Sequence, residues 1–250
     1  MAKAKDPARR RRALLAVLLL LAALFLGWRL YVGDYYRAGA EAQAVLRVTE
    51  PVSVAYRADL DALVFAPEGA ERGLIFYPGA KVEYTAYAPL MERFAAEGTL
   101  CVLLHMTDNL AVLEADAAAA IPAAFPEIRS WAVGGHSLGG VMAARFAAGH
   151  AGELEGLLLL AAYATEDLSA SGLRVVSIFG SEDGVLDRGA YEKNRPLLPA
   201  DTAELVIAGG CHAGFADYGA QKGDGTPTLS AAEQMDLTAA FAREKLWPDE

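Results

Sequence analysis

From about residue 50 onward, short runs of consecutive apolar residues alternate with longer amphipathic stretches. Unbroken apolar runs predict strands that are buried on both faces, as in a parallel sheet. We expect seven strands, several of them continuous apolar runs, at residues 60–66, 73–77, 99–106, 130–134, 154–161, 173–179 and 203–208. An eighth segment, Val52 to Tyr56, alternates between apolar and polar positions and predicts an antiparallel edge strand.

The stretches between these strands carry helical patterns. Apolar positions in residues 87–94 fall on one helical face, and the alanine-rich residues 114–124 predict a second helix. Residues 138–149 predict a helix that opens with small side chains. Ser230 and Glu233 have the spacing of a capping box and predict the start of a final helix. Strands that alternate with helices indicate a doubly wound, mostly parallel α/β sheet.

The N-terminal region has a different pattern. We divide the chain into a basic segment at residues 1–12, a transmembrane span at 13–32, a connector at 33–50 and a globular domain at 51–250. Six basic residues precede the span, and only Arg29 and Arg37 lie within it or soon after it. This charge bias predicts a cytoplasmic N-terminus and a globular domain on the outer side of the membrane.

The span could serve as a signal anchor or as a signal peptide. An Ala-x-Ala motif at residues 38–40 lies 14 residues beyond Leu26, farther than a cleavage site normally lies from its apolar region. We therefore favour an uncleaved anchor, and secretion after cleavage is the alternative. For the connector, a short helix and an unstructured tether are equally compatible with the composition.

Composition narrows the partners. The chain is 54% hydrophobic and 22% charged, which fits one compact domain. Beyond residue 40 there are 14 basic and 30 acidic residues, a net charge of −16, so nucleic acid is excluded as a partner. Cys101 and Cys211 lack the spacing of metal ligands; they either pair in an oxidising compartment or are buried as small apolar residues. We expect no metal and no cofactor, and self-association is left open.

The strand at residues 130–134 leads into a Gly-x-Ser-x-Gly motif centred on Ser137. A serine on a sharp turn between a strand and a helix presents its hydroxyl at the edge of the sheet, and glycines two residues before and after make room for that turn. Gly135 and Gly139 occupy those positions. The motif predicts a nucleophile, and a glycine-rich turn with an incidental serine is the alternative.

A serine nucleophile needs a base, and the base needs a carboxylate that fixes its tautomer. Asp183 follows the strand at 173–179, and His212 follows the strand at 203–208, in the chain order that such a turn requires. Both lie at the carboxyl ends of strands, where catalytic groups of open α/β sheets gather. Glu182 and Asp187 are the alternative acids, whereas His105, His136 and His150 precede the required position.

A tetrahedral intermediate also needs two N–H donors. The backbone amide of Leu138, directly after the serine, is one candidate. The second is expected from the loop at residues 78–81, with Ala80 favoured over Lys81.

Together, the Pro78-Gly79 loop, the serine motif, residues 180–184 and His212 resemble the α/β-hydrolase superfamily, over about residues 60–247. More narrowly they are similar to its compact dienelactone-hydrolase-like, or carboxymethylenebutenolidase-like, branch. The resemblance implies a serine hydrolase with Ser137, Asp183 and His212 in the triad positions. The chain departs from that branch in having serine where dienelactone hydrolases use cysteine, and from most α/β-hydrolases in having Pro-Gly where they have His-Gly.

Loop lengths bear on the substrate. Only residues 162–172 separate two successive strands at the position where lids of this fold are usually inserted, so we expect an open site. Lys81, Tyr84 and Phe215 are candidate substrate contacts, and Asp224 is interpreted as part of a turn before the last helix. We expect a membrane-anchored serine esterase that cleaves small or medium carboxylic esters, lactones or thioesters through an acyl-enzyme. The alternatives are an acyltransferase with the same triad and a non-catalytic binding protein on a hydrolase scaffold.

Overall fold

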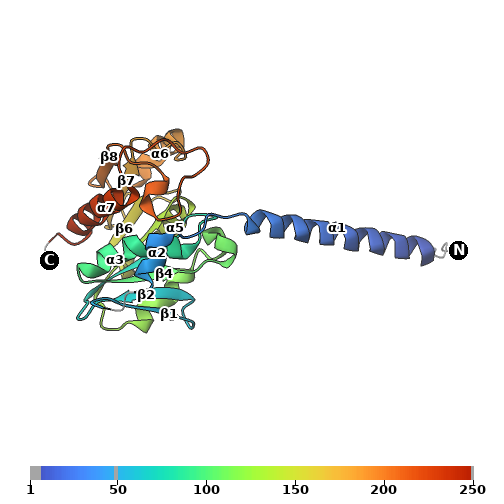
Figure 1. Cartoon of the computed structure of the whole chain (residues 1–250), viewed down its shortest axis with the longest axis horizontal. Helices are drawn as coiled ribbons and strands as arrows, with labels where there is room; N and C mark the ends of the chain where they lie inside the picture. The colour runs from blue at the N-terminus through green and yellow to red at the C-terminus, as the bar shows by residue number, and fades with distance from the viewer. Residues whose placement is uncertain (1–6, 48–49, 249–250) are drawn as a thin grey trace. The chain divides into compact units, whose positions relative to one another are not determined.

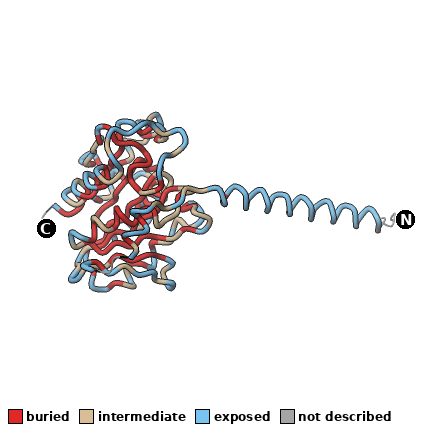
Figure 2. Tube along the Cα trace, viewed as in Figure 1, coloured by how far each residue is buried: buried red, intermediate tan, exposed pale blue. Residues whose placement is uncertain are grey.

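The computed structural model describes residues 7–47 and 50–248. The chain divides into two compact units, residues 1–35 and 36–250. The first unit contains helix α1 (Pro7–Gly33), in which residues Ala8–Gly33 form a segment long and apolar enough, by length and composition, to cross a membrane. Figure 2 shows this helix exposed along nearly its whole length. Residues 1–6 of the predicted basic segment lie outside the described residues.

The second unit is built on an eight-stranded sheet (Figure 1). The strands are β1 (Ser53–Arg57), β2 (Ala62–Ala66), β3 (Arg72–Tyr77), β4 (Thr99–Leu104), β5 (Ser130–His136), β6 (Gly156–Leu160), β7 (Arg174–Gly180) and β8 (Ala203–Ile207). Their spatial order is β1-β2-β4-β3-β5-β6-β7-β8. The six strands from β4 to β8 in that order are parallel, and β1 and β2 form an antiparallel edge. The predicted doubly wound, mostly parallel sheet is confirmed.

Helices cover both faces of the sheet. Along β3, Leu74 and Phe76 join the core cluster beneath α2 (Ala40–Val45), α3 (Ala88–Ala96) and α7 (Ala231–Leu246). Ile75 and Tyr77 point to the opposite face, into the core under α4 (Ile121–Ala124) and α5 (Leu138–His150). Helix α6 (Arg188–Asn194) follows β7. Burial of the sheet on both sides explains its unbroken apolar runs, which Figure 2 shows as a red interior.

The capping box that begins α7 is present as predicted. The Ser230 hydroxyl accepts a hydrogen bond from Glu233 N–H, and the Glu233 carboxylate accepts one from Ser230 N–H. The connector contains a helix, α2, rather than a wholly irregular tether. Ala42 and Val45 of α2 are buried within the second unit.

The prediction of one helix at residues 114–124 is wrong. This segment forms a 3-10 turn (Ala117–Ala120) followed by the single turn α4. The buried hydroxyl of Tyr77 donates a hydrogen bond to Ala115 C=O and accepts one from Ala118 N–H, at 2.7 and 3.1 Å. Because these backbone groups bond to a side chain of the sheet, a regular helical ladder does not form there.

Cys101 and Cys211 are both buried free thiols. They are therefore not paired in a disulfide, and the interpretation as small buried apolar residues is confirmed. Burial raises the pKa of both thiols, to about 11 for Cys211. Neither is therefore a reactive thiolate at neutral pH.

Candidate active site

Ser137 lies at the junction of β5 and α5, in a strained backbone conformation. Its φ of 54° and ψ of −126° are unusual for a residue with a side chain. The flanking glycines are required sterically, since a Cβ on Gly135 would approach backbone atoms of Gly139 to 2.5 Å. A Cβ on Gly139 would overlap carbonyl oxygens at the end of β3. The N–H of Leu138 is the first amide of α5, one of those that an α-helix leaves without an intrahelical acceptor.

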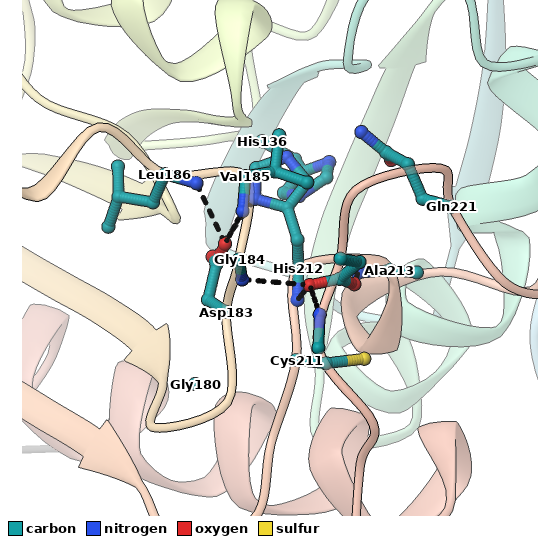
Figure 3. A network of polar contacts seen from close by, with 12 residues as sticks. His136, Gly180, Asp183, Gly184, Val185, Leu186, Cys211, His212, Ala213 and Gln221 are labelled. Atoms are coloured by element: carbon teal, nitrogen blue, oxygen red, sulfur yellow. Dashed lines mark hydrogen bonds and ion pairs between the residues drawn. The ribbon is translucent and has the colours of Figure 1, made fainter.

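Asp183 and His212 are hydrogen-bonded to each other. Nδ1 of His212 lies 2.9 Å from Oδ2 of Asp183, and both side chains are almost wholly buried. The other oxygen of Asp183 accepts hydrogen bonds from Val185 N–H and Leu186 N–H, at 2.9 and 2.8 Å (Figure 3). A carboxylate held in this way favours the tautomer of His212 that carries its proton on Nδ1, which leaves Nε2 as an acceptor.

The alternative acids and histidines are engaged elsewhere. Glu182 accepts a hydrogen bond from the hydroxyl of its neighbour, and Asp187 caps the N-terminus of α6. His105 pairs with an exposed aspartate, and His150 bonds to a carbonyl of its own helix. Asp183 is thus the carboxylate that meets His212.

Ser137 and His212 line the same cavity, of about 190 Å³. Nε2 of His212 is buried and has no hydrogen-bond partner within residues 7–47 and 50–248. It is free to exchange a proton with a hydroxyl or a substrate in this cavity. The rest of the wall is Leu138, Val141, Ala161, Ala162, Tyr163, Val185, Leu186 and Asp187.

The loop after β3 presents three successive amides near the site. Gly79 N–H donates to the hydroxyl of Tyr87 at 3.0 Å, and Lys81 N–H donates to Asn109 C=O at 2.9 Å. The amide of Ala80 makes no hydrogen bond in the part of the chain that the structure describes. This pattern favours Ala80 over Lys81 as a second donor to an oxyanion.

The predicted substrate contacts do not line this cavity. Phe215 is fully buried, with its ring 5.5 Å from His136, so it is a core residue and its assignment as a substrate contact is corrected. Tyr84 packs instead on His105, with 4.7 Å between ring centroids, and Lys81 lies in the same loop as Ala80. The short connection predicted between two successive strands is present: residues 161–173, between β6 and β7, form neither a helix nor a strand.

Sequence reasoning missed the apolar wall of the cavity. Val141 lies on the first turn of α5, Tyr163 follows β6, and Val185 and Leu186 follow β7. The available signal was positional, because β6 and β7 come after β5 in the sheet, and residues just beyond their carboxyl ends lie at the same edge as the serine.

His136 is buried against His212, with 4.5 Å between their ring centroids. Burial, together with the neighbouring His212, holds the pKa of His136 well below its usual value. The imidazole of His136 is therefore neutral at physiological pH.

The comparisons with known proteins agree with this fold. A search of curated protein sequences gives no significant match. Among solved structures, TT1662 from Thermus thermophilus is 16% identical to this chain, with a TM-score of 0.57. The alignment covers 78% of this chain and 98% of the TT1662 chain. Est1E from Butyrivibrio proteoclasticus is 13% identical, with a TM-score of 0.53, and the alignment covers 78% of this chain and 98% of Est1E. A protein described as a membrane phospholipase A, a novel bacterial virulence factor, is 14% identical (TM-score 0.53; 94% and 99% covered).

At these identities the structural likeness concerns the fold alone. A sequence model of a protein family carries the assignment further, since it matches residues 73–236, well over half of the chain. The matched region begins at β3 and extends into α7, and it contains the serine turn and both of its candidate partners. The chain belongs to the alpha/beta hydrolase family.

Proposed function

We propose that this hydrolase is a membrane-anchored serine esterase of the compact dienelactone-hydrolase-like branch, which cleaves small carboxylic esters through an acyl-enzyme. The observation that carries the proposal is the shared cavity of Ser137 and His212. At that cavity the histidine offers an unpartnered Nε2, while its other ring nitrogen bonds to Asp183. Acyl transfer through a serine uses a histidine that a carboxylate orients in this way and whose other ring nitrogen takes the proton of the serine hydroxyl.

In the proposed reaction, Oγ of Ser137 attacks the ester carbonyl while Nε2 of His212 takes its proton. The C–O bond of the ester breaks, and His212 returns the proton to the departing alcohol. Water then attacks the acyl-enzyme by the same route and releases the carboxylic acid. Asp183 stabilises the imidazolium form of His212, and the amides of Leu138 and Ala80 stabilise the oxyanion.

The size of the cavity supports a short acyl group. Its volume of about 190 Å³ is below the range of about 300–1,000 Å³ that is usual for pockets that bind drug-sized ligands. Most of the side chains that line the cavity are apolar, among them Val141, Val185 and Leu186, which favours an apolar acyl group. The long acyl chain of a typical lipid would not fit inside this cavity and would have to extend beyond it.

Helix α1 supports a membrane anchor. Its candidate membrane span, Ala8–Gly33, has 26 residues and extends about 39 Å at the helical rise, enough for the hydrocarbon core of a bilayer. Arginines 9–12 lie at its start, and Trp28 and Tyr31 lie near its end, where interfacial aromatic residues are common. The same charge bias supports an outward-facing hydrolase domain.

The connector supports an anchor that is not cleaved. Tyr36 pairs with Val82 as a parallel bridge: Tyr36 N–H donates to Lys81 C=O, and Glu83 N–H donates to Tyr36 C=O, both at 2.8 Å. Ala38 N–H donates to the carboxylate of Glu83 at 3.0 Å. Cleavage after the Ala-x-Ala motif at 38–40 would remove these bonds from the loop that carries Ala80.

A fluorophosphonate probe tests the proposed chemistry. In membranes that contain the full chain, we expect labelling of the wild type and its loss in Ser137→Ala, together with turnover of p-nitrophenyl acetate. Turnover should fall as the acyl chain lengthens. Formation of new esters with added alcohols would indicate acyl transfer instead, and an unlabelled, inactive but folded wild type would favour a binding protein.

A thiol reagent tests the orientation. Glu68 is exposed, whereas both native cysteines are buried, so Glu68→Cys introduces a single accessible thiol among the described residues. We expect a membrane-impermeant maleimide to label this variant in intact cells. Labelling only after the cells are broken would contradict the outward orientation.

A further inference from the structure

The carboxylate of Asp224 connects the two turns that carry Asp183 and His212. Its Oδ1 accepts hydrogen bonds from Gly184 N–H and His212 N–H, both at 3.1 Å. Its Oδ2 accepts one from Ala213 N–H at 2.8 Å. The carboxylate therefore bonds to the residue that follows the candidate acid, to the candidate base and to the residue after it.

A role in a local turn does not account for this pattern. An aspartate that only shapes its own turn bonds to backbone groups one to three residues away. Of the four amides that Asp224 accepts from, only that of Gly225 belongs to its own segment, at 2.9 Å. The other three lie 11, 12 and 40 residues away in sequence.

The segment that carries Asp224 is itself held in place. Asp224 N–H donates to Gln221 C=O at 3.2 Å, and the side chain of Gln221 accepts from the hydroxyl of Tyr218 at 2.8 Å. Gly225 packs so closely on the acid turn that a Cβ would overlap the carbonyl oxygen of Glu182. The carboxylate thus has a fixed position relative to both turns.

Asp224 is charged at neutral pH. Partial burial on its own would raise the pKa of this carboxyl, but hydrogen bonds from Ala213, Gly184, His212 and Gly225 together hold it below its usual value. Hydrogen bonds from N–H groups to an ionised carboxylate are stronger than those to a neutral acceptor. One charged group therefore binds the acid turn to the histidine turn.

We propose that Asp224 is a positioning residue of the esterase, which holds the backbone of His212 in register with the acid turn so that the Asp183–His212 pair keeps its geometry. This inference rests on the proposed function. Asp224 itself does not line the cavity at Ser137, so it acts through His212. A displacement of about 1 Å in such a site lowers the rate by about 100-fold.

The test compares Asp224→Asn with Asp217→Asn in the full chain in detergent micelles. Asp217 is a matched control, because its carboxylate accepts from Ala42 N–H at 2.9 Å and so bonds to α2 rather than to the histidine turn. For p-nitrophenyl acetate we expect Asp224→Asn to lower kcat by about 10- to 100-fold with KM within about twofold, because substrate binding does not involve the carboxylate. We expect Asp217→Asn to keep kcat within about twofold, since its bonds do not reach His212.

Proton NMR supplies a readout that does not depend on turnover. The Nδ1 proton of His212, shared with Asp183, should give a far-downfield resonance in the wild type, in Ser137→Ala and in Asp217→Asn. We expect this resonance to broaden or vanish in Asp224→Asn while circular dichroism shows a folded protein. Asp224→Ser shortens the side chain, so that its single hydroxyl can no longer reach both turns, and it should lower kcat at least as far as Asp224→Asn does.

Each outcome decides the proposal. Unchanged kcat and an unchanged resonance in Asp224→Asn would overturn the positioning role. So would unfolding of both Asp224 variants, which would show a purely structural residue. An inactive wild type that still shows the resonance, with the resonance lost only in the Asp224 variants, would refute the esterase activity while it supports the positioning by Asp224.

Discussion

The hydroxyl of Tyr87 lies 2.7 Å from Nδ1 of His136 and accepts a hydrogen bond from the backbone at the start of the loop after β3. Nδ1 of His136 is the acceptor within hydrogen-bond distance of this hydroxyl among the described residues, and donation of the phenolic proton to it places the proton of the neutral ring on Nε2. The residue before Ser137 and the residue before Ala80 are thereby linked through one buried side chain.

Replacing Tyr87 with phenylalanine is expected to destabilise the protein by about 1–3 kcal/mol, because it leaves Gly79 N–H and Nδ1 of His136 buried without partners. It should also lower kcat, because Gly79 loses its hydrogen bond and the amide of Ala80, the proposed oxyanion donor, belongs to the next residue. Thermal unfolding in detergent and turnover of p-nitrophenyl acetate measure the two effects. Tyr56→Phe is the control, because the Tyr56 hydroxyl bonds to Asp61 at an exposed position. Equal effects of both substitutions would contradict the argument.

Buried His136 predicts a stability that depends on pH. Its pKa is lowered in the folded state, chiefly by burial, so between that value and about 6.5 the unfolded chain binds more protons than the folded one. The contribution of His136 to the free energy of unfolding is therefore complete above pH 6.5. It falls as the pH drops below that value, by up to about 1.4 kcal/mol per pH unit. We expect the unfolding temperature of the wild type to fall on acidification. It should fall less steeply in His136→Gln, whereas His150→Gln should follow the wild type.

The sequence predicts the sheet well because the physics there is local and repetitive. Residues 74–77 and 100–104 are apolar at every position because helices cover both faces of the sheet, and this pattern can be recognised without knowledge of the packing partners. Residues 114–124 are the exception, and they show where prediction from local sequence fails. Their alanine content favours a helix, but the hydroxyl of Tyr77, some 40 residues earlier in the chain, takes two of the backbone groups.

The candidate site divides in the same way. Ser137, Asp183 and His212 are predictable because each follows a strand whose end must lie at one edge of a parallel sheet. Asp224 has no such marker: its sequence neighbourhood is that of a turn, and its bonds to Gly184 and His212 exist only after three loops have come together. Which residues line the cavity also depends on the tertiary structure. Phe215 is apolar and close to His212 in sequence, yet it is fully buried in the core.

Val141 offers a direct test of the acyl cavity. It lines the cavity beside Ser137, and its replacement by alanine enlarges the space without removing a polar contact. We expect Val141→Ala to shift the preferred p-nitrophenyl ester from acetate towards butyrate by about 10-fold or less in relative kcat/KM, the usual effect of one or two methylenes in a pocket. Val112→Ala, at a half-exposed position, should keep the wild-type preference. An unchanged preference in Val141→Ala would place the acyl group elsewhere.

The connector is expected to belong to the catalytic unit, and two truncations separate its role from that of the membrane span. A chain that begins at Asp34 keeps Tyr36 and its bridge to Val82, whereas a chain that begins at Glu41 loses every hydrogen bond between residues 36–39 and the loop at 81–83. For a water-soluble ester we expect the first chain to retain wild-type kcat within about twofold. The second should lose about 10-fold or more, since a displaced Ala80 amide weakens the oxyanion site. Equal activity of the two chains would show that the loop keeps its position without the connector, and it would remove the structural objection to cleavage after residue 40.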